Sequence, residues 1–492
     1  MTDGLWRVRT TVITWAHKLQ DATGLLTSGS SHLIYSVLGY KFWLSTDTLV
    51  ICSVGVCVSI FRSYDVRGIY GKDIDEGIMK RIGAAFCKVS TKTIVIANDM
   101  RVSSESLKRA FISGCNRQVI DCGRVPLGVG MMHALGKHDF AYITASHMPK
   151  EWNGVKFFHK SGIGFHEEEN KSVEKIFNDV MPTGKASIKK EDLKSLIDNY
   201  KRHVAGKIKI QNKLHVVIDC GNGMASIVAK DIFEDAGCSV ESIFDTLDGT
   251  FPGRGPDPSE SDLNDLKKKT LSADIGIAYD GDGDRMVIVD GKGRKLTPEQ
   301  TSYLILLEAV KNKGPIVANV ECTRLIDDIA KKFNKKVIRV PVGHTFMMQA
   351  VDENKACFGI EVSGHYTLPY MAPIDDSLMV SIYAAAVLSR QDKKLSEIVD
   401  SIKTYPFGRT NFDCDDKRKF IVIEKLRAKF KKDYKNVTTM DGVRVDFPDG
   451  WILVRASNTS PTIRLTVEAE NKKEFETLKK KFSEVVSKEI KN

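Results

Sequence analysis

From Arg62 onward, short apolar runs alternate with stretches of helical periodicity. The first cycle predicts strands at Thr93–Ala97, Gln118–Asp121 and Ala141–Thr144, and helices at Ser103–Ser113 and Val129–Leu135. Alternation of strand and helix is typical of βαβ units, whose strands pair into a largely parallel sheet. We therefore expect an α/β fold in this part of the chain.

The cycle then restarts twice. The second cycle predicts strands at His215–Asp219 and Ala273–Tyr279 around a helix at Met224–Ala236. The third predicts strands at Pro315–Asn319 and Lys336–Val340, a further strand ending at Ile360, and a helix at Thr323–Phe333. Three α/β units therefore follow one another along the chain.

The last stretch has a different pattern, typical of an α+β domain. It predicts a basic helix at Lys417–Lys432, strands at Trp451–Val454 and Thr462–Val467, and a final amphipathic helix at Lys472–Lys491. Clusters of Gly and Pro mark boundaries near Pro298 and at Thr404–Arg409. We expect domains at residues 58–200, 201–296, 297–403 and 404–492.

The first 57 residues do not share this pattern. The run Thr48–Phe61 is apolar, but it is too short to span a membrane, which takes roughly 20 residues. It also begins too late for a signal peptide and has no small-residue cleavage site after it. Two interpretations remain open: an amphipathic or membrane-touching extension, or translated sequence that the native protein lacks.

Composition narrows the function classes. A content of 42% hydrophobic and 28% charged residues is ordinary for a soluble globular protein. The ten cysteines are scattered without a C-x-x-C pair, which disfavours zinc and favours a reducing, cytoplasmic compartment. The net charge of +10 is spread along the chain among acidic residues, so it favours a small anionic substrate over nucleic acid.

The loop DGDGDR at Asp280–Arg285 follows a predicted strand and carries three carboxylates at alternate positions. Like charges at this spacing repel, by about 1 kcal/mol per pair in water and about 4 at an effective dielectric of 20, so a cation is the natural occupant. Oxygen ligands select a hard metal such as Mg²⁺. A calcium-binding EF-hand loop is excluded, because its required Gly and Glu fall on Arg285 and Gly291.

Two other strand ends carry polar clusters. In GIEVSGH, residues Glu361, Ser363 and His365 alternate, so an extended segment would present them on one side, as suits sugar hydroxyls. An ordinary polar edge is the alternative. The sequence PVGH, ending at His344, could place a second imidazole nearby.

A phosphate site is indicated in the last domain by RASNTSP at Arg455–Pro461, which lies between two strands. A guanidinium, small hydroxyl and amide side chains, and free backbone N–H groups suit a phosphate dianion. The alternative is a polar hairpin loop. Near the start of the first unit, Asp65-Val-Arg67-Gly68 adds another arginine beside a turn.

Ser146 lies in TASHMPKEWNGVKFF, after an apolar run. Its frame lacks the G-x-S-x-G pattern of a nucleophile elbow, and no acid and base complete a triad. Among a metal loop, a phosphate loop and sugar ligands, a serine is better suited to carry a phosphoryl group, whose transfer needs charge neutralisation and positioning.

Together these motifs resemble the α-D-phosphohexomutases, and most closely their phosphomannomutase/phosphoglucomutase branch. SYDVRG, TASHMPKEWNGVKF, DGDGDR, GIEVSGH and RASNTSP occur in the family's order, from about Ser59 to the C-terminus. The resemblance implies three α/β domains of shared topology and a C-terminal domain around a central cleft. It also implies that residues 1–57 have no counterpart, and that the native chain starts near Val58.

The resemblance implies a reaction in which phosphorylated Ser146 donates its phosphoryl group, a hexose 1,6-bisphosphate turns over, and the serine takes back the other phosphate. Mg²⁺ would be bound by Ser146, Asp280, Asp282 and Asp284. Catalytic residues would be Ser146, His147, Lys156, Arg285 and His344, with Lys156 and His344 as candidates for proton transfer. Substrate ligands would be Tyr64, Arg67, Gly343, Glu361, Ser363, His365, Arg455, Ser457, Asn458, Thr459 and Arg464.

Departures from the family pattern leave the sugar open. Met148 stands where the family most often has Asn, and Ser460 replaces a common acidic residue. The second change favours mannose or glucose phosphates over glucosamine phosphate. A phosphoglucosamine mutase and a Mg²⁺-dependent sugar phosphatase remain alternatives, and the sequence does not reveal the oligomeric state.

Overall fold

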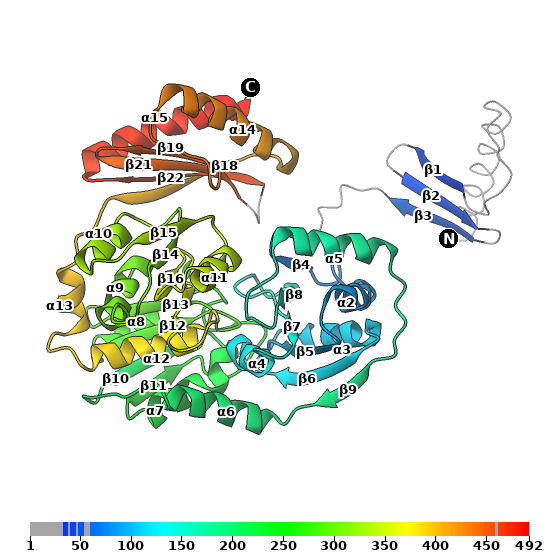
Figure 1. The fold of residues 1–492 in the computed structure, drawn as a ribbon, viewed down its shortest axis with the longest axis horizontal. Coiled ribbons are helices and arrows are strands. Elements are labelled where there is room, and N and C mark those ends of the chain that lie inside the picture. The colour runs from blue at the N-terminus through cyan, green and yellow to red at the C-terminus, as the bar shows by residue number, and fades with distance from the viewer. Residues whose placement is uncertain (1–32, 38–39, 46–47, 54–59, 458–460, 492) are drawn as a thin grey trace. The chain divides into compact units, whose positions relative to one another are not determined.

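The computed structural model describes residues 33–37, 40–45, 48–53, 60–457 and 461–491 (Figure 1). The chain divides into two compact units, residues 1–59 and 60–492. In the first, β1 (Leu33–Val37), β2 (Tyr40–Ser45) and β3 (Thr48–Ser53) form an antiparallel sheet. None of the described helices is long and apolar enough to cross a membrane.

The first α/β domain of the second unit has six strands in the order β4-β8-β7-β5-β6-β9. Their bounds are β4 (Asp65–Ile69), β5 (Thr93–Asn98), β6 (Gln118–Arg124), β7 (Asp139–Ile143), β8 (Trp152–Phe158) and β9 (Ser187–Lys190). The helices are α2 (Glu76–Val89), α3 (Ser104–Gly114), α4 (Leu127–Ala134), α5 (Glu167–Asp179) and α6 (Leu193–Ala205). The pairs β5–β6, β5–β7 and β6–β9 are parallel. The pairs β7–β8 and β4–β8 are antiparallel.

The second and third α/β domains have four-stranded sheets in the orders β11-β10-β12-β13 and β15-β14-β16-β17. The second contains β10 (His215–Asp219), η1 (Met224–Ile227), α7 (Ala229–Asp235), β11 (Ser239–Ile243), α8 (Asn264–Thr270), β12 (Ile275–Tyr279) and β13 (Met286–Asp290). The third contains α9 (Pro298–Ala309), β14 (Ile316–Asn319), α10 (Leu325–Lys332), β15 (Val337–Val340), α11 (His344–Glu353), β16 (Phe358–Ile360), β17 (Tyr366–Thr367), α12 (Ser377–Leu388) and α13 (Leu395–Asp400).

The three α/β domains repeat one arrangement. In each, a central strand (β5, β10 or β14) lies between two parallel partners, and the last strand pairs antiparallel with one of them. The hairpins β7–β8, β12–β13 and β16–β17 are therefore equivalent positions. They carry Ser146, DGDGDR and GIEVSGH respectively, so the shared topology places three of the predicted loops at the same point of the repeat.

The fourth domain is a five-stranded antiparallel sheet in the order β18-β22-β21-β20-β19 (Figure 1). Its elements are β18 (Phe407–Asp413), α14 (Asp416–Asp433), β19 (Val437–Thr438), β20 (Val443–Phe447), β21 (Gly450–Ala456), β22 (Thr462–Ala469) and α15 (Lys472–Lys491). The two predicted basic helices pack on one face through apolar residues such as Phe430 and Phe482. Most of their lysines are exposed, but Lys419 is buried and donates to the Ser457 carbonyl.

The cores show how the domains are joined. One cluster of buried apolar residues continues from the first α/β domain through the second into the third. The fourth domain has a core of its own, and only a small cluster of Val320, Trp451 and Leu453, with partly buried neighbours, joins it to the third among the described apolar clusters. The fourth domain is thus the most separable of the four.

Most predicted elements are confirmed to within about two residues, the usual uncertainty of element ends. The helix predicted at Met224–Ala236 is wrong as one element, because Val228 (φ −141°) breaks it into η1 and α7. Helix α6 runs across residue 200, so the boundary expected there falls inside a helix. The eight cysteines of residues 60–457 are buried.

Candidate active site

The loops of all four domains line one cavity of about 380 Å³. Most predicted site residues lie on its wall: Tyr64, Arg67, His147, Lys156, Arg285, Gly343, His344, Glu361, Ser363, His365, Arg455, Ser457 and Arg464. Ser146 and the DGDGDR aspartates are buried beside Lys156 and His147. The predicted ligands Asn458 and Thr459 lie outside the described residues.

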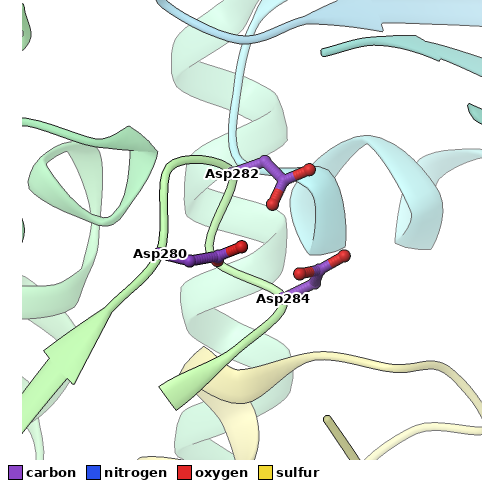
Figure 2. A group of neighbouring side chains, drawn as sticks. All are labelled: Asp280, Asp282 and Asp284. Atoms are coloured by element: carbon purple, nitrogen blue, oxygen red, sulfur yellow. The ribbon is translucent and has the colours of Figure 1, made fainter. Parts of the chain in front are cut away.

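The β12–β13 hairpin gathers Asp280, Asp282 and Asp284 on the same side of its loop (Figure 2). One carboxylate oxygen of each lies within 4.8 Å of the others, and at most 3% of any of these residues is exposed. The intervening glycines are required for this packing. Gly283 has φ +84°, and a Cβ on Gly281 would lie 2.5 Å from the Ser146 carbonyl oxygen.

This aspartate cage has a charge that only a cation can balance. Lys156, from β8 of the first domain, donates to Asp282 Oδ2 at 2.9 Å and to Asp284 Oδ2. Burial and the two other aspartates raise the pKa of Asp280 well above its usual value. Although burial opposes it, Lys156 and His365 lower the pKa of Asp284 well below its usual value.

Asp282 Oδ1 is buried without a hydrogen-bond partner among the described residues, whereas Asp284 Oδ1 lies 3.4 Å from His365 Nε2. A buried unpaired carboxylate oxygen is costly, and a divalent cation with oxygen ligands would satisfy it. The donor set therefore fits a hard metal ion.

Ser146 occupies the equivalent hairpin of the first domain and forms one wall of the cage. Its Oγ donates to Asp280 Oδ2 at 2.7 Å, and its N–H donates to Thr144 Oγ1 at 2.8 Å. Its φ of +51° is uncommon for a residue with a Cβ, and such strain clusters at functional sites. The neighbouring His147 is neutral, because burial, Arg285 and Arg67 hold its pKa well below its usual value.

Beneath this loop lies a support that the sequence analysis missed. Arg101 is 2% exposed, and Asp99 pairs with it at 3.2 Å while accepting from Thr144 Oγ1 at 2.7 Å. The Arg101 guanidinium donates to four carbonyls of the serine loop and the start of β8: Ser146, Met148, Pro149 and Trp152. The charged pair directly after strand Thr93–Ala97 was the available signal, since parallel-strand ends collect functional groups.

The expectation that GIEVSGH is extended is wrong. Residues 361–365 form a tight turn, in which the Glu361 N–H donates to the His365 carbonyl and the Gly364 N–H to the Glu361 carbonyl. Gly364 has φ +91°, which a turn of this kind needs. The turn still brings the polar groups together: Ser363 Oγ lies 2.8 Å and Glu361 Oε2 3.5 Å from His365 Nδ1.

Two imidazoles from the third domain stack in the cavity, with the rings of His344 and His365 5.3 Å apart and 17° from parallel. Burial and His365 lower the pKa of His344 to about 3. Although burial opposes it, Asp375 and Asp284 raise the pKa of His365 to about 10. His344 is therefore neutral and able to accept a proton, while His365 is a fixed cation. Asp375, 3.9 Å from His344 Nδ1, was not predicted.

The fourth domain presents a guanidinium face to the cavity. Arg455 in β21 pairs in register with Arg464 in β22, so both side chains share one face of the sheet, opposite α14 and α15. Arg455 Nε donates to Asp441 Oδ2 at 3.1 Å, and Arg464 Nε to Asn411 Oδ1 at 3.2 Å. Two charged residues on the same wall, Glu321 and Arg409, were not predicted.

Another part of the cavity wall is formed by residues of the first and third domains. Tyr64 OH donates to the Val342 carbonyl at 3.1 Å, and Arg67 pairs with Asp65. Gly343 has φ +144°, and a Cβ there would lie 2.8 Å from the Tyr64 ring. Glycine is thus needed here for close packing as well as for its backbone conformation.

Four sequence families match the chain consecutively. They are described as Phosphoglucomutase/phosphomannomutase, alpha/beta/alpha domain I (residues 58–183), domain II (193–293) and domain III (297–405), and C-terminal domain (410–485). The chain belongs to the phosphoglucomutase/phosphomannomutase family. The predicted family and fold class, with three α/β domains and a C-terminal domain, are confirmed.

The similarity of this phosphohexomutase to its relatives extends over nearly the whole length of those relatives. It is 33% identical to the phosphoglucomutase/phosphomannomutase of Thermococcus kodakarensis, over 84% of this chain and 95% of that one. It is also 33% identical to the phosphoglucosamine mutase of Methanocaldococcus jannaschii, over 86% and 98%. A crystal structure of a phosphoglucomutase/phosphomannomutase family protein from Burkholderia thailandensis is 28% identical, with a TM-score of 0.79 over 88% of this chain and 97% of that one.

Proposed function

We propose that this phosphohexomutase interconverts hexose 1-phosphate and hexose 6-phosphate, of mannose, glucose or both, through a phosphorylated Ser146 and a bisphosphorylated sugar. One observation carries the proposal. The Ser146 hydroxyl, on a strained backbone, is hydrogen-bonded into a cage of three carboxylates, and the guanidinium face lines the adjoining cavity. A phosphorylated serine and a phosphosugar would meet there.

Mg²⁺ is the metal that we propose for the cage, held by Ser146, Asp280, Asp282 and Asp284. When bound, such an ion neutralises charge on the transferring phosphoryl group. The support is the donor set: the four side chains offer buried oxygens only, and Asp282 Oδ1 has no hydrogen-bond partner among the described residues. Lys156, already bonded to two of the aspartates, adds a second positive charge at the same place.

The chain's own groups would carry the remaining steps. The bond from phosphorus to Ser146 Oγ would break while a sugar hydroxyl oxygen bonds to phosphorus. The hydroxyl proton would pass to Nε2 of neutral His344, whose Nδ1 faces Asp375, and in balance Ser146 Oγ would gain the proton that the sugar hydroxyl loses. Glu361 and Ser363 would hold sugar hydroxyls, and Arg455 and Arg464 would bind the phosphate already on the sugar.

The bisphosphate would then have to turn within the cavity, because the proposal gives it one phosphoryl acceptor, Ser146, and one guanidinium face. Its second phosphate would pass to Ser146 Oγ, and the proton would return to the oxygen it leaves. We further propose a cytoplasmic enzyme whose partner is a small phosphosugar, because the ten cysteines are scattered without a C-x-x-C pair and the eight described ones are buried.

A phosphoglucosamine mutase is the second candidate. It is favoured by the similarity to the Methanocaldococcus jannaschii relative, which matches as closely as the Thermococcus kodakarensis one. A sugar phosphatase explains the site less well, because hydrolysis needs no second phosphate site opposite the serine.

The test is a coupled assay with the 1-phosphates of glucose, mannose and glucosamine, with a trace of bisphosphate and Mg²⁺. We expect conversion to the 6-phosphate without release of inorganic phosphate. Ser146→Ala should lower kcat by at least about 10³-fold, since the group carrier is lost, while Ser161→Ala, an exposed serine on a loop, should not. Release of inorganic phosphate, or near-normal turnover by Ser146→Ala, would refute the proposal.

A further inference from the structure

Arg409 is a third guanidinium on the same face of the fourth-domain sheet as Arg455 and Arg464. It lies in β18 opposite Thr466 of β22, and Thr466 is two residues from Arg464 on that strand. Residues two apart on a strand, and residues paired across strands, share a face. Arg409 also lines the cavity beside Arg455 and Arg464.

Each of the three arginines has its Nε against a side-chain oxygen, through a hydrogen bond for Arg455 and Arg464 and through an ion pair for Arg409. Asp441 accepts from Arg455 and Asn411 from Arg464, and Glu321 Oε1 lies 2.8 Å from Arg409 Nε. An arginine fixed at Nε keeps its two terminal nitrogens for a ligand. Among the described residues, those two nitrogens of Arg409 have no hydrogen-bond partner.

Glu321 is built to hold this arginine. It follows β14 in the third domain, is 1% exposed, and accepts from Thr466 Oγ1 at 2.8 Å with the same oxygen that faces Arg409. Although burial opposes it, Arg409, Arg455 and Arg464 lower the pKa of Glu321 below its usual value. Its charge is therefore maintained inside the arginine cluster, where it offsets their mutual repulsion.

We propose that Arg409 is a third phosphate-binding arginine of this site and that Glu321 is the positioning residue that aims it. The inference rests on the proposed function for the identity of the ligand, a phosphosugar. Because Glu321 belongs to the third domain and Arg409 to the fourth, phosphate bound by Arg409 would also fix the fourth domain against the third. A planar guanidinium with two free nitrogens suits the bidentate geometry of phosphate.

The experiment measures binding of inorganic phosphate and of glucose 6-phosphate to the full chain by calorimetry, in EDTA so that the aspartate cage repels anions. We expect Arg409→Ala to weaken binding of both ligands at least about 10-fold, as loss of a charge-assisted contact does. Arg409→Lys should recover only part of it. The dependence of affinity on salt should also become less steep in Arg409→Ala.

Arg324→Ala is the matched control. Arg324 also joins the third and fourth domains, through Glu468 and Glu470, but it does not line the cavity. We expect it to change phosphate affinity less than about 3-fold. Equal weakening by Arg324→Ala and Arg409→Ala would overturn the proposal, because both would then act only on the domain junction. Unchanged affinity in Arg409→Ala would overturn it as well.

A double-mutant cycle tests the role of Glu321. If it acts by aiming Arg409, Glu321→Gln should weaken phosphate binding in the wild-type background and have little effect in Arg409→Ala. Additive effects would overturn the positioning role. Because inorganic phosphate is the probe, Arg409-dependent binding can be found even if the chain turns over no hexose phosphate, which separates failure of this proposal from failure of the proposed function.

Discussion

The aspartate cage and the guanidinium face each concentrate three like charges at the same cavity, but they are assembled differently. The cage lies in one hairpin loop, where alternate positions and glycines bring Asp280, Asp282 and Asp284 together. The face draws its arginines from three strands of one sheet, and the strand register aligns them. One cluster is local in the sequence, and the other exists only once the sheet has formed.

Both clusters are balanced by a group from a neighbouring domain. Lys156 of the first domain bonds to the cage of the second, and Glu321 of the third pairs with Arg409 of the fourth. Like charges held at short range store repulsion that a ligand of opposite charge can relieve. Under the proposed function, the two clusters would therefore bind ligands of opposite charge, a cation in the cage and a phosphate on the guanidinium face. Each ligand would also link two domains.

The largest effect should come from breaking the cage. We expect Asp284→Asn to lower kcat by about 100-fold and to raise the Mg²⁺ concentration needed for half activity by about 10-fold or more, because one of three carboxylate ligands is lost. In EDTA the same variant should melt a few degrees lower than wild type, because Lys156 and His365 lower the pKa of Asp284 and so gain from its charge.

The control for this pair of measurements is Asp352→Asn, the same change at an exposed surface ion pair with Lys355. It should alter neither activity nor melting. If Asp284→Asn melts higher than wild type in EDTA, repulsion from Asp280 and Asp282 outweighs the pairing with Lys156 and His365, and the lowered pKa of Asp284 is contradicted.

Breaking the face should act on binding rather than on turnover. We expect Arg455→Ala to raise KM for the hexose phosphate about 10-fold to 100-fold with a smaller change in kcat, since a charge-assisted contact to a phosphate that does not react is lost. Steady-state kinetics at saturating Mg²⁺ would measure it. Arg444→Ala, on the same sheet but outside the cavity, is the control; a fall in kcat alone would contradict the comparison.

The smallest effect concerns Glu468, at the junction between the third and fourth domains. Glu468 is buried there, accepting from the Arg324 N–H and from Trp451 Nε1, and burial raises its pKa to about 7. The folded chain therefore keeps this proton while the unfolded chain loses it near pH 4.5. Its contribution to stability is complete below pH 4.5 and is lost as the pH rises through 7, amounting to at most about 3 kcal/mol.

The amide side chain of Glu468→Gln is neutral at every pH. The melting temperature of this variant, relative to that of wild type, should therefore rise by a few degrees between pH 5 and pH 8. Glu470→Gln, two residues on, provides a control with no pH dependence over this range, because Lys403 keeps the pKa of Glu470 below the usual value and the carboxyl is ionised above pH 5 in both states. Thermal melts of both variants at four pH values would decide. A constant difference across that range for Glu468→Gln would show that its carboxyl titrates normally.

The sequence by itself determined the order of strands and helices and the spacing that groups the DGDGDR carboxylates, because periodicity and local spacing depend on neighbouring residues alone. It also singled out Ser146, whose role stays a prediction. The fold class and the family followed from motifs in one order. The sequence analysis was wrong about a single helix at Met224–Ala236 and about an extended GIEVSGH. In GIEVSGH the backbone conformation depends on hydrogen bonds that exist only in the folded turn.

Only the tertiary structure decided which distant residues meet. Arg101 looked like one of many arginines until β5 and the serine loop were folded together, and TYPFGR looked like a boundary until strand register placed Arg409 beside Arg464. Contacts of this kind join positions far apart in the chain, and no local pattern encodes a partner in another domain. The sequence specifies which residues are charged. Their pairing, their burial and their shifted pKa values depend on the folded arrangement in which all four domains line one cavity.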